Sequence, residues 1–186
     1  MRDIYWEWLH APGQEHLRLI EKPEAIIAEG VVAGTLENGT FRMHYLVTCD
    51  RAWRFRHAEV QLEQGPARRE VHLGREPDGH WHVDGVERLD LRSCTEIDLM
   101  GSPFTNTLPI RNLGLAPDEA REIRVAYIRV PELAVTPEAQ VYTRLDPGEP
   151  PRRFRYHGVG SGFTADLAVD EAGLVVDYPG LWRRRG

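Results

Sequence analysis

The 186-residue sequence has few cysteines and no long hydrophobic run. Its two cysteines, Cys49 and Cys94, form no CxxC pair, so they fit a reducing compartment and we expect two small buried side chains. No window approaches the roughly 18 apolar residues of a membrane helix. Charged residues interrupt the stretch Met1–Trp8, where a signal peptide would have its apolar region. We therefore expect a cytoplasmic protein without a membrane span.

Positive charge is not in excess either. Lys and Arg number 23 against 29 for Asp and Glu, and the resulting net charge of −6 disfavours a nucleic-acid backbone as the main partner. With 41% hydrophobic residues, a chain of this length suits one globular domain, residues 1–186, that buries roughly two-thirds of its unfolded surface.

Helical periodicity is nearly absent, and most of the chain has the pattern of strands. Apolar and polar residues alternate from Phe41 to Cys49, which predicts a strand with one buried and one exposed face. A second apolar run at 25–33 and the pair Asn38-Gly39 between the two runs predict a hairpin. The sequence therefore predicts an all-β fold with little or no helix.

The alternation changes parity near Arg56 and His57, which predicts a β-bulge in a bent strand. The turn residues Pro77-Asp78-Gly79 predict another hairpin, and further alternating strands begin at Ile123 and Phe163. These strands extend the same all-β pattern to the end of the chain.

Two segments of the chain match each other. Residues 55–81 map onto residues 154–175 once a loop is shortened, beginning with Phe55-Arg56-His57 on Phe154-Arg155-Tyr156. Two interpretations remain open. Either the chain contains an internal duplication of a bent strand followed by a hairpin, or two alternating patterns match by chance.

Two prolines bracket the segment 102–110, in which apolar residues alternate with hydrogen-bonding ones. Proline fixes φ, removes a backbone donor and biases the preceding residue toward extended geometry. We therefore predict a stiff, extended segment whose polar side chains, Thr105, Asn106 and Thr107, form the wall or rim of a binding site.

Few residues point to a metal or to covalent catalysis. His80, His82 and Asp84 share one strand face, as zinc ligands can, but Trp81 would then face the core and leave that face in water. No serine lies in a GxSxG context, neither cysteine has an obvious neighbouring base, and no helical pattern follows the glycines at 158–162. We therefore predict no bound metal, no cofactor and no covalent catalytic residue.

Glu96 and Asp98 lie about 7 Å apart on one face of a predicted strand. Such a pair could carry out general acid/base catalysis on a sugar. Alternatively, the two acids form an exposed face or pair with Arg111 and other arginines, which we favour because carboxylates are mostly exposed.

Four ordered blocks spread over nearly the whole chain carry a resemblance. They are Cys49–Trp53, Gly79–Gly85, Pro103–Arg111 and Asp170–Gly180. Together they resemble the bacterial family labelled putative glycolipid-binding, and the third block and the Asp177-Tyr178-Pro179-Gly180 ending are the most specific. Asn112 departs from the second arginine that the family pattern leads us to expect after Arg111.

The resemblance implies a spiral β-roll, a single antiparallel sheet of many strands curled on itself, similar in shape to the periplasmic lipoprotein carriers that hold acyl chains. It also implies a non-enzymatic carrier or sensor of a small amphiphile, such as a glycolipid or a fatty-acyl compound. The implied site has apolar or stacking walls of Trp53, Phe104, Tyr142 and Tyr178, and a polar head group held by Thr105, Asn106, Arg111 and Asp177.

Two alternatives to a carrier remain open at this point. The first is an enzyme acting on a small amphiphilic or glycosidic substrate, with Glu96, Asp98 or Asp177 as proton carriers in a concave, partly dry site. The second is a scaffold that binds another protein through an open, apolar sheet edge.

Overall fold

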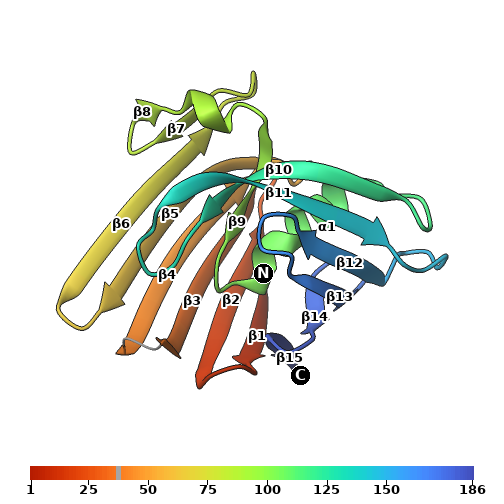
Figure 1. Cartoon of the computed structure of the whole chain (residues 1–186), viewed down its shortest axis with the longest axis horizontal. Helices are drawn as coiled ribbons and strands as arrows, with labels where there is room; N and C mark the ends of the chain where they lie inside the picture. The colour runs from red at the N-terminus through yellow and green to blue at the C-terminus, as the bar shows by residue number, and fades with distance from the viewer. Residues whose placement is uncertain (37–38) are drawn as a thin grey trace.

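Apolar and polar residues alternate along much of the chain, and the fifteen strands that they form join in one curled sheet (Figure 1). In this computed structural model, residues 1–36 and 39–186 are described. Strands make up 58% of the residues and helices 7%, which confirms an all-β fold with little helix.

The strands of the first half follow one another as neighbours in the sheet. They are β1 (Arg2–Trp8), β2 (Gly13–Glu21), β3 (Ile26–Leu36), β4 (Gly39–Cys49), β5 (Phe55–Gln64), β6 (Ala67–Arg75), β7 (Trp81–Val83) and β8 (Val86–Glu87). A 3-10 turn, η1 (Leu89–Leu91), leads into the second half.

The second half contains the two short helices and seven further strands. Its elements are β9 (Cys94–Leu99), the 3-10 helix η2 (Pro103–Asn106), α1 (Thr107–Asn112), β10 (Ala120–Ile128), β11 (Val135–Arg144), β12 (Arg153–Gly158), β13 (Thr164–Val169), β14 (Val175–Tyr178) and β15 (Trp182–Arg185).

The two halves meet where the first and last strands pair. The order along the sheet is β8 to β1, then β15 back to β9, so the antiparallel pair β1–β15 lies in the interior of the sheet. The sheet is not closed, and β8 and β9 are its edges. The long strands β2–β6 lie side by side, and the second half of the sheet curls round toward them with α1 between (Figure 1).

One pair of neighbouring strands departs from the predicted antiparallel sheet. Strands β9 and β10 run parallel, so the sheet is mixed. Parallel neighbours need a crossover of a dozen or more residues. Residues 100–119 supply this crossover, and they contain η2 and α1.

The local strand predictions are confirmed. In β4, Phe41 through Cys49 alternate between the buried face and the outer face. Thr48 pairs with His57 and Cys49 with Phe55, which leaves Arg56 as the extra residue of the predicted bulge. The predicted hairpin is formed by β3 and β4, but Asn38 in its turn lies outside the described residues.

The prediction of an extended chain over 102–110 is wrong, because the segment forms η2 and α1. Both prolines stand where a helix tolerates them. Pro103 begins η2 and Pro109 is in the first turn of α1, where backbone N–H groups have no intrahelical acceptor. Ser102 caps η2, since its Oγ accepts a hydrogen bond from the Phe104 backbone N–H at 3.2 Å. We call residues 102–112 the helical segment.

A contiguous hydrophobic cluster occupies the inside of the curl and includes residues from both halves of the sheet. Both cysteines are buried and free, as predicted. Trp81 is fully buried and stacks on Phe55, with 5.2 Å between the ring centres. Among the described residues, no helix has the length and apolar character to cross a membrane.

The two matching segments occupy β5–β7 and β12–β14. Each triplet runs in the same order along the sheet. Corresponding positions also share their burial, as for Leu73 with Leu167 and Trp81 with Val175. The internal duplication stays a prediction.

Candidate functional site

Two cavities border the helical segment, one at each end. The first is lined by Ser102 and Asn106 near the start of the segment, and the second by Ile110 to Asn112 at its end. We call them the aromatic cavity and the arginine cavity, after their lining side chains. They share no lining residue.

The aromatic cavity has a volume of 320 Å³ and walls made mainly of large apolar side chains. Trp8 of β1 and Trp182 of β15 stack with their ring centres 5.6 Å apart, so the β1–β15 pairing builds part of the wall. Phe163 and Tyr178 form another part of the wall, with their ring centres 6.2 Å apart. The remaining apolar or aromatic lining residues are Leu36, Phe41, Leu99, Met100, Tyr127, Val130, Tyr156 and Leu181.

One end of the aromatic cavity is acidic. The carboxylate of Asp98, on β9, accepts hydrogen bonds from Thr105 Oγ1 at 3.0 Å and from Gln140 Nε2 at 2.5 Å. Burial raises the pKa of Asp98 despite these two donors. The second amide atom of Gln140, Oε1, is buried and has no hydrogen-bond partner among the described residues.

Hydrogen bonding extends from this acidic end to the helical segment. Asn106 lines the cavity, and its Oδ1 accepts a hydrogen bond from the Tyr142 hydroxyl at 2.9 Å. Tyr127 also lines the cavity, and burial together with the negative charge of Asp98 raises its pKa to about 12. No Lys, Arg or His is among the described residues that line the cavity. The polar end therefore presents hydrogen-bonding oxygens without a cation.

A second buried acid fixes the start of the helical segment on the sheet. Glu15 of β2 is 1% exposed, and its Oε1 accepts hydrogen bonds from the Tyr45 hydroxyl at 2.5 Å and from Ser102 Oγ at 2.8 Å. Burial raises the pKa of Glu15 to about 8. Tyr45 needs a glycine across the sheet, because a Cβ at Gly30 would lie 2.0 Å from its ring. Glu15 thus positions Ser102 through a network that spans β2, β4 and η2.

Glu15 is not among the predicted site residues, although its position in the sequence pattern is informative. Glu15 alternates with Leu17 and Leu19, so it stands on the buried face of β2. A carboxylate at the start of a buried apolar alternation needs hydrogen-bond donors from elsewhere in the fold. Only the fold brings Tyr45 and Ser102 to it.

The arginine cavity has a volume of 510 Å³ and is lined by three arginines. Arg111 lies over the ring of Trp53, with 4.2 Å from its Cζ to the ring centre, and burial lowers its pKa. Arg144 donates to Leu115 and Gly148 carbonyl oxygens and pairs with Glu149. Its guanidinium therefore holds the neighbouring loops in place.

The other two arginines of this cavity have no carboxylate partner among the described residues. Arg51 donates to the Lys22 carbonyl oxygen at 2.9 Å, and Arg111 donates to the Ala172 carbonyl oxygen at 2.5 Å. The arginine cavity therefore differs from the aromatic cavity in the sign of its charge.

The structure divides the eight predicted site residues between these environments. Asn106 and Tyr178 line the aromatic cavity, whereas Trp53 and Arg111 line the arginine cavity. The other four line neither. Thr105 and Tyr142 are hydrogen-bonded to the lining residues Asp98 and Asn106, Phe104 is fully buried against Tyr45, and Asp177 pairs with Arg183 at 3.3 Å.

The favoured interpretation of Glu96 and Asp98 as an exposed acidic face is wrong. Their face of β9 turns inward, where the helical segment and β11 supply hydrogen-bond donors. Glu96 is 4% exposed, its Oε1 accepts from Asn112 Nδ2 at 2.7 Å, and burial raises its pKa to about 7. Asn112, where the family pattern suggests arginine, thus places a neutral donor on this acid.

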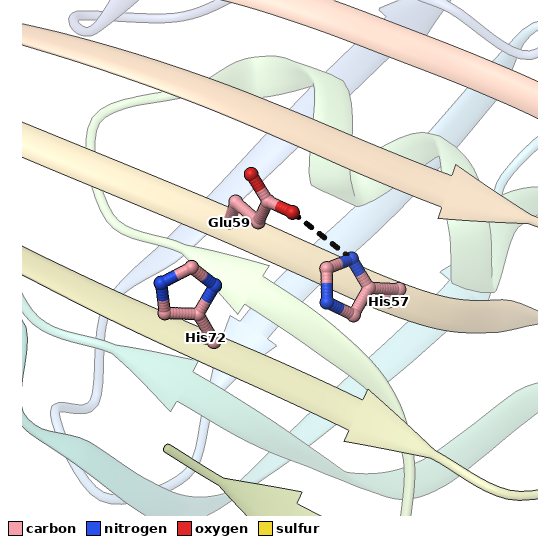
Figure 2. Close-up of side chains that lie close together, drawn as sticks. All are labelled: His57, Glu59 and His72. Carbon is pink, nitrogen blue, oxygen red and sulfur yellow. Dashed lines mark ion pairs between the residues drawn. The ribbon is translucent and has the colours of Figure 1, made fainter. Parts of the chain in front are cut away.

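The predicted strand face of His80, His82 and Asp84 does not gather into a metal site. His80 Nδ1 lies 2.8 Å from Glu87, His82 Nδ1 lies 3.8 Å from Glu76, and the Asp84 carboxylate accepts from the His72 backbone N–H. Another group does gather. His57, Glu59 and His72 place one potential ligand atom each within 4.8 Å of one another on β5 and β6 (Figure 2).

Comparison with known proteins agrees with the curled sheet. A solved structure from Pseudomonas aeruginosa, described as a DUF1089 family protein, matches with a TM-score of 0.82 and 38% sequence identity. The match covers 93% of this chain and 92% of that one. No match was found among proteins of curated function. A family model described as "Putative glycolipid-binding" matches residues 3–184, and the chain therefore belongs to this family.

Proposed function

We propose that the protein binds a lipid-like or glycolipid-like amphiphile in the aromatic cavity and acts as a non-catalytic carrier or sensor. The observation that carries this proposal is the cavity itself. It combines stacked aromatic and aliphatic walls with one polar end, formed by Asp98 and Asn106. Ligand sites of this kind are mostly apolar, with a few converging polar groups that fix the orientation of the ligand. The family description supports the same class of ligand.

The size of the cavity limits which amphiphiles can fit. Its 320 Å³ lies near the lower end of the range of roughly 300–1,000 Å³ that is typical of small-molecule sites. We therefore propose a single-chain amphiphile, with its chain against Trp182 and Phe163 and its head at Asp98.

The polar end of the cavity limits which chemical class of head group the ligand can carry. The polar lining residues Asp98 and Asn106 offer acceptor oxygens to hydrogen-bond donors of a ligand, and none of the described lining residues is a Lys, Arg or His that could neutralise an anion. A head rich in hydroxyl groups satisfies these acceptors. A carboxylate or phosphate would meet half-buried Asp98 without a counter-charge among the described lining residues.

A pair of cavity-filling variants tests this proposal. Ser161 and Ala52 are exposed residues that line the aromatic and the arginine cavity, respectively. We expect octyl glucoside, measured by calorimetry below its micelle concentration, to bind the wild type and Ala52→Trp alike. Ser161→Trp should weaken binding at least tenfold, because the indole occupies the space of the chain. Equal binding by both variants, or no binding by the wild type, would contradict the proposal.

Dodecanoate and dodecyl phosphate test the charge of the head separately. We expect both to bind more weakly than the alkyl glucoside, since their anionic heads meet Asp98. Native mass spectrometry of the protein purified from bacterial cytosol adds an independent measurement. A retained neutral amphiphile is the expected result, and an empty protein that also fails to bind the glucoside would count against a carrier.

The environment of Asp98 supports a second candidate function, which is catalysis. Its carboxyl lines a concave, largely apolar cavity and its pKa is raised by burial, as a general acid requires. Glu96 does not line that cavity, so the paired acids would not act on one bond there. Nitrophenyl glycosides test this candidate, with loss of hydrolysis in Asp98→Asn as the expected result. Absence of hydrolysis by the wild type would leave the carrier as the sole proposal.

A further inference from the structure

His57, Glu59 and His72 form a cluster on the outer face of the sheet, away from both cavities. His57 and Glu59 alternate along β5, and Glu59 pairs directly across the sheet with His72 of β6. Gly74 stands opposite His57, so no side chain fills the space beside that ring. Figure 2 shows the three side chains on the same side of the two strands, facing one another.

The ligand atoms of this cluster are available. His57 Nδ1 lies 4.0 Å from Glu59 Oε1, and neither side chain makes a hydrogen bond within the described residues. His72 Nε2 lies 2.9 Å from Glu70 Oε1. This contact leaves Nδ1 of His72 free on the side of the cluster. A carboxylate on the far nitrogen is the arrangement that orients histidine ligands in many metal sites.

We propose that His57, Glu59 and His72 bind a divalent transition-metal ion such as Zn²⁺. Two imidazoles and one carboxylate suit zinc, nickel or copper, whereas magnesium and calcium prefer an all-oxygen set. Ligand atoms bound to zinc at about 2.0–2.2 Å lie roughly 3.4 Å apart in tetrahedral geometry. The three side chains are between 42% and 44% exposed, so they close from within 4.8 Å by side-chain rotation. Water completes the coordination.

The metal site is separate from the proposed amphiphile site. Ala58 and Val60, which alternate with the ligands along β5, are fully buried on the inner face of the sheet. The ion would connect β5 to β6 from the outside. Zinc binding and amphiphile binding can therefore succeed or fail independently of each other.

Calorimetric titration of the full chain with zinc chloride tests the site. We expect one zinc ion per chain and at least a tenfold loss of affinity in His57→Ala and in His72→Ala. Glu70→Gln should weaken binding by about tenfold, because it removes the orienting carboxylate but no ligand. His44→Ala is the matched control, since His44 is exposed on the outer face of β4 and opposes Gln61 and Val31. It should bind zinc as the wild type does.

Two further measurements separate ligand loss from misfolding. Thermal unfolding without metal should be nearly the same in all five proteins, because the substituted side chains are exposed. Added zinc should raise the unfolding midpoint of the wild type and of His44→Ala but not of His57→Ala. The proposal is overturned if the wild type binds no zinc at high micromolar concentration, or if the His57 and His72 variants bind as well as the control.

Discussion

The aromatic cavity and the arginine cavity border the same helical segment but differ in charge and in polarity. The first is lined by the acid Asp98, whereas Arg51 and Arg111 of the second have no carboxylate partner among the described residues. Half-buried Asp98, whose pKa is raised, lines the first cavity with buried Glu15 behind it, and a guanidinium stacked on Trp53 lies in the second.

The curl of the sheet therefore does not by itself determine which ligand binds. Each end of the helical segment meets different strands, so each cavity receives its own set of polar groups. The aromatic cavity can exclude anions because Asp98 has no counter-charge among the described lining residues, and the arginine cavity can accept anions. The following predictions test how far the two regions differ.

The largest effect is expected from Glu15→Gln. The folded-state pKa of Glu15 is about 8 against 4.5 in the unfolded chain, so the folded protein holds a proton that the unfolded chain releases. Wild-type stability from this group is therefore full below about pH 4.5 and is lost as the pH rises to about 8. The variant should gain up to about 4 kcal/mol relative to wild type over this range, from the 1.36 kcal/mol per pKa unit.

Urea unfolding at several pH values measures this difference. Glu122→Gln, on the exposed face of β10, is the matched control and should show the same pH dependence as wild type. A Glu15→Gln variant that parallels the wild-type curve would mean that Glu15 is ionised in the fold.

Gly30→Ala should have the next largest effect. The added Cβ would overlap the buried ring of Tyr45 and displace its hydroxyl from Glu15. We expect a loss of roughly 1–3 kcal/mol in the free energy of unfolding. Gly74→Ala provides the control within the same sheet, since nothing lies within 4 Å of its added Cβ, and it should change stability by less than about 0.5 kcal/mol. Similar losses in both variants would contradict the tight fit of Tyr45.

Arg111→Ala should have a moderate effect limited to the arginine cavity. It removes a cation–π contact worth about 0.5–1 kcal/mol when partly exposed. Stability should fall by about this amount, whereas octyl glucoside affinity should stay unchanged. A parallel loss of glucoside affinity, measured by calorimetry, would show that the two cavities are coupled.

Asp177→Asn should have the smallest effect. Asp177 pairs with Arg183 on the surface and lines neither cavity. Exposed ion pairs contribute about 0–1 kcal/mol, so we expect a change below about 0.5 kcal/mol and wild-type glucoside binding. A tenfold loss of affinity would restore the sequence-based assignment of Asp177 to the ligand site.

Much of the strand pattern could be predicted from the sequence, because a half-buried strand depends on neighbours two residues apart. The alternation of β4, the bulge at Arg56 and the burial of Trp81 follow from such local patterns. The helical segment could not be predicted in this way. It is buried on nearly all sides inside the curl, so it shows no apolar stripe, and its prolines indicate extended chain when read alone.

The candidate site depended more on the fold. Asn106 and Tyr178 were predicted and do line the aromatic cavity, but Trp53 and Arg111 belong to the other cavity. Their separation follows from the placement of η2 and α1 within the crossover between the parallel strands β9 and β10. The burial of Glu15 and Glu96 and the partial burial of Asp98 also required that crossover, since Ser102, Asn112 and Thr105 supply their hydrogen bonds.

Local alternation along the chain is enough to predict most of the strands and the apolar face of each, because these features depend on residues two apart. The pairing of β1 with β15, the parallel run of β9 with β10 and the meeting of polar groups inside the curl depend on the folded chain as a whole. Those contacts join residues far apart in sequence, and their stability arises from burial on several sides at once, which no local pattern records.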